Sequence, residues 1–332
     1  MANPLTQPPR SQVTLSLPLQ AVLDLEPTPP FNFKGTLYKP SHFPSPTDDF
    51  SGGTFRFTMS LDDMNYGICL RQANSSDSLE AQVFAAQNIS QDMVDRIAEE
   101  LKFRFDLEAD LRGFIATAQT DELLAPVERR WRGMRPSCAY SLYELICITI
   151  VLQNAQVSRS VKMLDALLRT YGLSVKFDGT VMLAFWTPIE MAAVSEEELR
   201  QLKVGYRAKT VRKVSEFFSQ HPTFESNVML LDKDAGAQEL RRIFGIGPAS
   251  CWYLLFEKFH HYDAFDYVSP WERKILSHLL CGVPDANAAD VLSLAKERWG
   301  KWRMLAVHYL FEDLFWKHRH EPIDWLKSLI RL

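Results

Sequence analysis

The chain has 332 residues, of which 46% are hydrophobic and 23% are charged, and its formal net charge is −4. The length corresponds to about two domains, and the composition excludes a disordered or fibrous chain and indicates a globular protein with a sizeable core. The longest uncharged apolar run, Leu145 to Leu152, is too short to span a bilayer.

Two further sequence features bear on the cellular compartment of the protein. The first eleven residues lack the apolar segment of a secretory signal. The five cysteines have no CxxC spacing, which argues against a zinc ribbon, an iron–sulfur cluster or a disulfide scaffold and favours a reducing compartment. We therefore expect a cytoplasmic protein, associated with the nucleoid if the source is prokaryotic.

The charge is distributed unevenly along the chain. Residues 1–125 contain 9 Lys and Arg against 17 Asp and Glu, a net charge of −8, whereas residues 126–332 contain 28 against 24, a net charge of +4. A pI near 6.1 argues weakly against a nucleic-acid partner, because phosphate backbones attract basic surfaces. The basic excess of the second part means that the whole-chain pI does not decide this question.

Residues 1–104 are predicted to form an α+β domain with a proline-rich start. The stretches 27–30 and 40–46 are rich in proline, which is typical of loops. Alternation of apolar and polar residues predicts strands over 54–59 and 66–71. Residues 91–103 are predicted to form an amphipathic helix with Met93, Ile97 and Leu101 on one face.

Residues 105–332 are predicted to form a mainly α domain. Gly172 is expected to end one helix, and Ser195 followed by three glutamates is expected to begin another. The predicted helices are Ser141 to Gln153, Val157 to Tyr171, Tyr206 to Phe218, Gly247 to Phe259, Pro270 to Leu280, Asp290 to Trp299 and Trp302 to Trp316.

The sharpest local feature is Gly245-Ile246-Gly247, followed by Pro248. This order predicts a helix that ends near Phe244, a tight turn held to the core by Ile246, and a new helix that begins at Pro248. Backbone N–H groups at such a helix start attract an anion, and the glycines let a phosphate come close. The alternative is an ordinary connection between two helices.

Five ordered segments between residues 105 and 316 carry a further signal. They contain Leu152-Gln153-Asn154, Gly205-Tyr206-Arg207, Gly245-Ile246-Gly247, Tyr262-Asp263-Ala264-Phe265 and Arg298-Trp299 with Trp302-Arg303. Together they resemble the helix-hairpin-helix (HhH-GPD) DNA glycosylase superfamily, and the last of them is similar to a motif of bacterial 3-methyladenine DNA glycosylase II. The resemblance implies a helical glycosylase fold preceded by a smaller α+β domain.

The resemblance implies that the protein flips a damaged base out of double-stranded DNA and hydrolyses its N-glycosidic bond in base-excision repair. Candidate base-pocket residues are Tyr206, Trp252 and Trp271, although core packing is the alternative for such aromatic residues. Candidate DNA-binding residues are Gly245, Ile246, Gly247, Ala249, Arg207, Lys209, Gln153 and Asn154. The basic run 201–220 is explained equally well as a solvated helix face.

The catalytic carboxylate is the main departure from the family pattern. Counted from the hairpin, the family's Asp position falls on Val268 or Ser269, and neither can serve. Asp266 is our candidate, since a shifted loop can bring its carboxylate to the same point. The alternative is that Asp266 is a turn residue or caps the helix that begins at Pro270. Asp263 and Glu272 are weaker substitutes.

The lysine nucleophile of bifunctional members lies two residues after the second hairpin glycine, where this chain has Ala249. The resemblance therefore implies a monofunctional glycosylase without lyase activity, with an alkylated purine as substrate. Three alternatives stay open. One is an 8-oxoguanine-type glycosylase, because residues 205–208 also resemble those enzymes. The others are a catalytically silent module that binds DNA damage, and a helical protein whose motifs arise by chance.

The expected partner is double-stranded DNA that contains damaged bases, and we expect a monomer with no membrane partner. No cofactor is expected, and a monovalent cation at the hairpin is the one ion that the resemblance leaves open. His260-His261 and His318 with His320 have no third and fourth ligand nearby in sequence, so we expect surface histidines and no metal.

Overall fold

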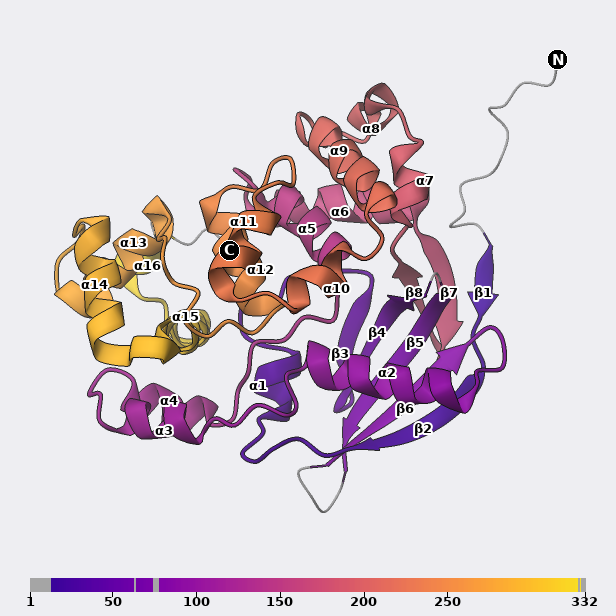
Figure 1. Ribbon diagram of the computed structural model, residues 1–332. Helices are drawn as coiled ribbons and strands as arrows, with labels where there is room; N and C mark the ends of the chain where they lie inside the picture. Colours follow the sequence, from indigo (N-terminus) through magenta and orange to yellow (C-terminus); the bar gives the residue numbers. More distant parts are fainter. Residues whose placement is uncertain (1–12, 63, 74–77, 328, 330–332) are drawn as a thin grey trace. The chain divides into compact units, whose positions relative to one another are not determined.

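The computed structural model describes residues 13–62, 64–73, 78–327 and 329 (Figure 1). The segment on which the absence of a secretory signal was predicted lies outside the described residues. The chain forms two compact units that interleave along the sequence. Unit 1 comprises residues 1–26, 43–101 and 139–222, and unit 2 comprises residues 27–42, 102–138 and 223–332. The boundary predicted after residue 104 lies beside the junction between residues 101 and 102, but residues 139–222 group with the N-terminal strands.

Unit 1 contains a five-stranded antiparallel sheet in the order β2-β6-β5-β4-β3. Both strands predicted from alternation are present in it, as β4 and β5. The strands are β2 (Leu19–Leu25), β3 (Asp48–Ser51), β4 (Thr54–Leu61), β5 (Met64–Gln72) and β6 (Leu79–Ala85). Phe55 and Phe57 are alternate residues of β4, and both are buried. Arg56, which lies between them, forms an ion pair with Asp178 at 2.8 Å.

A second sheet of unit 1 joins distant parts of the sequence. The strand β1 (Thr14–Ser16) runs parallel to β7 (Leu173–Phe177), which pairs antiparallel with β8 (Thr180–Ala184). This hairpin was not predicted, because residues 105–332 were expected to be helical. It explains why residues 139–222 belong to unit 1.

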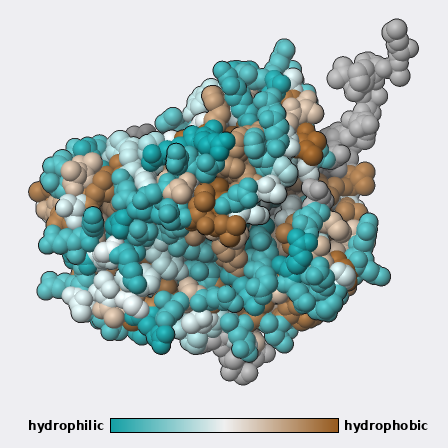
Figure 2. Space-filling model, viewed as in Figure 1, coloured by the Kyte–Doolittle hydropathy of each residue, from teal (hydrophilic) through white to brown (hydrophobic). Residues whose placement is uncertain are grey.

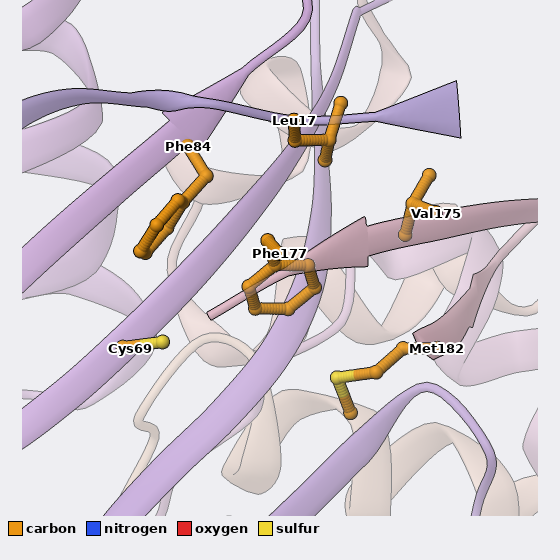
Figure 3. Close-up of a cluster of buried hydrophobic side chains, with 6 residues drawn as sticks. All are labelled: Leu17, Cys69, Phe84, Val175, Phe177 and Met182. Atoms are coloured by element: carbon orange, nitrogen blue, oxygen red, sulfur yellow. The ribbon is translucent and has the colours of Figure 1, made fainter. Parts of the chain in front are cut away.

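A buried cluster fixes the second sheet to the first. Figure 3 shows its side chains, which come from residues of both sheets and from Leu17 after β1. The ring of Phe177 lies against Gly67 of β5, where an added Cβ would come within 2.3 Å of the ring. Gly67 is therefore required by close packing. The cluster comprises Leu17, Cys69, Phe84, Val175, Phe177 and Met182.

The helices of unit 1 follow the predicted apolar spacing. Ser141 and Glu144 form a capping box, and α5 is buried along almost its whole length. Gly172 ends α6 as predicted, but in an extended conformation, and a Cβ there would lie 2.5 Å from the Leu168 carbonyl oxygen. The helices are α2 (Gln91–Arg104, which continues into unit 2), α5 (Leu142–Leu152), α6 (Val157–Tyr171), α7 (Pro188–Ala192), α8 (Glu196–Gln201) and α9 (Arg207–Gln220).

Unit 2 is helical within the described residues. Two predicted ends are corrected: α11 ends at Leu240, before Phe244, and the helix from Pro270 becomes a π-helical turn at Ser277. Its elements are α1 (Phe33–Leu37), α3 (Arg112–Gln119), α4 (Ala125–Trp131), α10 (Phe224–Met229), α11 (Lys233–Leu240), α12 (Pro248–Glu257), α13 (Pro270–Leu276), η2 (Ser277–Cys281), α14 (Ala288–Trp299), η3 (Gly300–Trp302), α15 (Arg303–His320) and α16 (Asp324–Lys327).

The predicted fold class, mainly α with a smaller α+β part, is confirmed. Many of the hydrophobic residues in the part of the chain that the structure describes are buried, and hydrophilic residues cover most of the face seen in Figure 2. No helix among the described residues is both long enough and apolar enough to cross a membrane.

Candidate nucleic-acid interface and carboxylate site

The hairpin predicted around Gly245 joins α11 to α12. Gly245 has a φ of +87°, in the left-handed region where glycine is favoured. Ile246 is buried, as predicted, and its N–H donates to the Ile243 carbonyl oxygen at 3.1 Å. The two helices pack closely, since a Cβ on Gly236 would lie 3.0 Å from Leu255. The turn is therefore held rigidly by unit 2.

At Gly247, in contrast, neither the backbone conformation nor the packing requires glycine. It is the N-cap of α12, with φ −91° and ψ 179°, a conformation open to any residue. A Cβ there would meet no protein atom within 4 Å. The first hydrogen bond of α12 runs from the Cys251 N–H to the Gly247 carbonyl oxygen at 2.9 Å, so the N–H groups of Ala249 and Ser250 precede the helical ladder. This is the open helix N-terminus at which an anion can be bound.

Asp266 lies in an ion-pair cluster of unit 2. Lys233 at the start of α11 donates to one carboxylate oxygen of Asp266, and Arg303 at the start of α15 donates to the other at 2.9 Å. Both cations also lie near Asp263, at 3.5 and 3.7 Å. Partial burial would raise the pKa of Asp266, but the hydrogen bonds from Lys233 and Arg303 outweigh it and hold the pKa below its usual range. Asp266 is therefore an ionised carboxylate, and its side chain is 38% exposed.

Neither residue at the family's Asp position is available for catalysis. Val268 is 5% exposed and belongs to the core. Ser269 is the N-cap of α13, and it forms a capping box in which the Glu272 carboxylate accepts the Ser269 N–H at 2.9 Å. The cap of α13 is thus Ser269 and not Asp266, and Glu272 is occupied by the same box.

The loop that carries Asp263 and Asp266 is anchored at Tyr262. The Tyr262 hydroxyl donates to Asp106, and the Tyr262 carbonyl oxygen accepts the Met304 N–H at 2.8 Å. His260 lies on the other side of the Asp106 carboxylate, with 3.5 Å between Nδ1 and Oδ1. Burial raises the pKa of Asp106 to about 7, and the hydrogen bond from Tyr262 offsets this only in part.

We expect Asp106 to make the folded protein less stable as the pH rises. Its folded pKa exceeds the unfolded value, so its contribution is full below about pH 4 and is lost as the pH rises through about 7, by up to about 1.4 kcal/mol per pH unit. An Asp106→Asn variant lacks this loss. Its melting temperature should therefore rise relative to wild type between pH 5 and pH 8.

Glu108→Gln is the control for this measurement, because it removes a carboxylate that is 73% exposed two residues away. Its difference from wild type should stay flat across the same pH range. A flat difference for Asp106→Asn would contradict the prediction. Because burial lowers the pKa of His260 to about 3, its ring is neutral in the folded wild type throughout this pH range, and its titration in the unfolded chain is common to both proteins.

In unit 1, three predicted residues come together at the end of α5. The Tyr206 hydroxyl donates to the Gln153 carbonyl oxygen at 3.2 Å, and the Asn154 amide donates to the same hydroxyl at 3.4 Å. Asn154 has a φ of +50°, which turns the chain sharply after the helix. The Tyr206 side chain is 50% exposed. These residues form a polar, partly aromatic surface on unit 1.

The structure does not place Arg207 on a phosphate-binding surface. Its side chain is 3% exposed, and its guanidinium donates to the carbonyl oxygens of Ile150, at 3.1 Å, and of Gln153. Arg207 therefore caps the C-terminus of α5 and positions the Gln153–Asn154 turn. Lys209, two residues later, is exposed.

The two tryptophans proposed for a base pocket differ in environment. Trp252 is 9% exposed, and cations lie near its ring, with the Lys233 amine at 5.4 Å and the Arg241 guanidinium at 5.6 Å from the centroid. Trp271 is more exposed but packs against Phe311 of α15 and donates its indole N–H to the Leu329 carbonyl oxygen at 2.8 Å. Trp252 thus belongs to the surroundings of the hairpin and the Asp266 cluster.

The motif at residues 298–303 supports this site. Arg298 and Trp299 both donate to Asp121, at 2.8 and 2.9 Å, which fixes the end of α14. Arg303 then reaches Asp266. Lys233 was not singled out from the sequence, because it is 33 residues away from Asp266 and no local pattern marks it.

Two histidine expectations are corrected. His318 is buried, and the His260 side chain is only 11% exposed, so neither is a surface histidine. Burial lowers the pKa of His260 to about 3, so its ring is neutral. Among the described residues, no three His, Cys, Asp or Glu side chains lie together as metal ligands.

Comparisons with known proteins agree on the fold. No protein-family model matches the sequence. A Methanothermobacter thermautotrophicus protein named "Probable N-glycosylase/DNA lyase" is 24% identical over 234 residues, which cover 65% of this chain and 74% of the relative. The structure of 3-methyladenine DNA glycosylase from Archaeoglobus fulgidus has a TM-score of 0.74 at 18% identity, covering 91% of this chain and 99% of the other.

A second structure widens the comparison. The Clostridium acetobutylicum 8-oxoguanine glycosylase/lyase has a TM-score of 0.68 at 17% identity, covering 90% of this chain and 98% of the other. The relative and both solved structures are named as glycosylases, and the chain has the fold of those structures. Because neighbours of both substrate classes occur, the particular resemblance to 3-methyladenine DNA glycosylase II stays a prediction.

Proposed function

We propose that this chain, which has the helix-hairpin-helix DNA glycosylase fold, is a DNA glycosylase that binds damaged double-stranded DNA and releases a base. The observation that carries the proposal is the open N-terminus of α12. The surface beside Gly247 is open, although neither its backbone conformation nor its packing requires a residue without a side chain. The turn before Gly247 is fixed by Gly245 and Ile246. A DNA phosphate fits this arrangement.

In the proposed reaction the damaged nucleotide is turned out of the duplex, because its glycosidic bond cannot be reached within the stack. Positive charge builds on the sugar as the base leaves. The Asp266 carboxylate, kept ionised by Lys233 and Arg303, stabilises that charge and helps to orient the attacking water. Within unit 2, Trp252 beside the Asp266 cluster is the proposed aromatic contact of the extruded base.

We propose hydrolysis without strand cleavage, on an alkylated purine. The residue at the lysine position of bifunctional enzymes is Ala249, whose methyl group cannot form a Schiff base. Trp252 beside the Asp266 cluster is consistent with an electron-poor, alkylated base. An 8-oxoguanine substrate is the second choice within the same class.

One observation favours a second function, a DNA-damage-binding module without catalysis. The family's Asp position is filled by buried Val268 and by the cap residue Ser269. The Asp266 cluster also contains two carboxylates and two cations, so it carries no net charge. Its field at a distant sugar is weak, and only a close approach of Asp266 itself would stabilise the transition state.

The experiment that separates these functions is base release from duplexes that carry one methylated purine or one 8-oxoguanine. The full chain should release the methylated base and leave the strand intact, with no DNA–protein adduct after borohydride. Binding of damaged duplex without release of either base would establish the silent module instead. An adduct trapped by borohydride would contradict the hydrolytic mechanism.

A further inference from the structure

A hollow of about 440 Å³ on unit 2 shares no residue with the hairpin or the Asp266 cluster. It lies between the segment 32–40, the end of α4 and the last turn of α15. Its volume falls within the range of about 300–1,000 Å³ that is typical of small-molecule sites. Nothing in the proposed glycosylase reaction uses it.

The charged side chains that line the hollow are all basic. Lys39 is paired with Glu257 at 2.7 Å, and Arg130 is held by the buried carboxylate of Asp313. Arg319 donates only to a backbone oxygen, that of Pro40, at 2.9 Å. Among the described residues neither Lys34 nor Arg319 pairs with a carboxylate. The hollow therefore has two uncompensated positive charges, which favour an anion.

Flat side chains line the same hollow. The Arg130 guanidinium lies 4.8 Å from the centroid of the Trp316 ring, and the His320 ring lies 4.4 Å from it. The Arg130 side chain is 41% exposed. Guanidinium planes that rest on aromatic rings can stack a further flat ring, and bases in single strands are bound in this way. Tyr38, also exposed, provides a second ring at the rim.

We infer that this hollow binds a nucleotide. Its phosphate lies at Lys34 and Arg319, and its base stacks on the Arg130 guanidinium, which rests on the Trp316 ring. The nucleotide is either free or part of a single DNA strand, since both present the same base and phosphate. A purely anionic partner such as an acidic peptide would satisfy the cations but would not use the flat surfaces.

The first test is calorimetric titration of the full chain with dAMP, with deoxyadenosine, with inorganic phosphate and with a single-stranded oligonucleotide of eight deoxyadenosines. We expect dAMP to bind with sub-millimolar affinity and more tightly than deoxyadenosine or phosphate alone. Phosphate that binds as tightly as dAMP would overturn the inference, because the base would then contribute nothing. Absence of binding by both dAMP and the oligonucleotide would overturn it too.

Substitutions test whether dAMP binds in this hollow. Arg319→Gln and Lys34→Gln change exposed side chains and should each weaken dAMP binding about tenfold, and Trp316→Leu should remove the preference for dAMP over phosphate. Arg112→Gln is the matched control, an 85% exposed arginine of the same unit, and should have no effect. An equal loss in Arg112→Gln would show diffuse charge attraction and overturn the inference.

The oligonucleotide distinguishes the two sources of the nucleotide. Because the hairpin also attracts phosphates, the informative quantity is the loss that Arg319→Gln causes. If Arg319→Gln weakens binding of the oligonucleotide tenfold and dAMP does not bind, the hollow binds a single DNA strand. If Arg319→Gln weakens binding of both ligands, the hollow also binds the free nucleotide. All these ligands are undamaged and no base release is measured, so the result is independent of the proposed glycosylase activity.

Discussion

Asp266→Asn is expected to reduce the rate of base release about a thousandfold while leaving DNA binding intact. A carboxylate about 4 Å from a positive sugar contributes about 4 kcal/mol at the effective dielectric constant of a protein surface. Each 1.36 kcal/mol of lost transition-state stabilisation reduces the rate tenfold. Asparagine has the same shape but no charge, so the change isolates the electrostatic role. Single-turnover release from a methylated duplex is the measurement.

Asp263→Asn is the matched control, because Asp263 lies near the same two cations, Lys233 and Arg303. It removes one negative charge from the cluster without touching Asp266, and it should reduce release less than tenfold. Equal losses in both variants would show that the cluster acts only by holding the loop. Unchanged release in Asp266→Asn would exclude Asp266 as the catalytic carboxylate. Melting temperatures of both variants should confirm that the loop is intact.

The residues that local pattern can reveal were predicted well. The hairpin turn, the burial of Ile246 and the helix start at Pro248 follow from glycine, apolar and proline preferences within a few residues. The strands β4 and β5 follow from alternation. The turn, the helix start and the strands all depend on residues that are close together in the sequence, so a single sequence is enough to predict them.

The features that the sequence did not predict depend on contacts between residues that are far apart in the chain. Arg207 is chemically suited to a phosphate, and only the fold shows that the carbonyl oxygens of Ile150 and Gln153 take its donors. The hairpin β7–β8 is joined in its sheet by β1, which lies more than 150 residues earlier in the sequence. Lys233 and Arg303 reach Asp266 from 33 and 37 positions away. Propensity carries no information about such pairings.

Gly247→Val should weaken binding of double-stranded DNA at least tenfold, at a cost in stability of about 1 kcal/mol because valine is a poor N-cap residue. The backbone of Gly247 is extended, and an added Cβ would meet no atom within 4 Å apart from its chain neighbours, so we expect the variant to fold. The branched side chain would instead fill the space before the N–H groups of Ala249 and Ser250, where the phosphate is proposed to lie. Loss of that contact removes at least about 1.4 kcal/mol, or a factor of ten.

Ala289→Val is the matched control, since it introduces the same side chain at an exposed position in the first turn of α14, another helix of unit 2. Affinity should be measured at several salt concentrations, because loss of a phosphate contact makes the salt dependence shallower as well as weakening binding. The Ala289 variant should keep both the affinity and the slope of wild type. If folded Gly247→Val binds DNA as wild type does, the helix start is not a phosphate site, and Gly247 belongs to an ordinary connection between two helices.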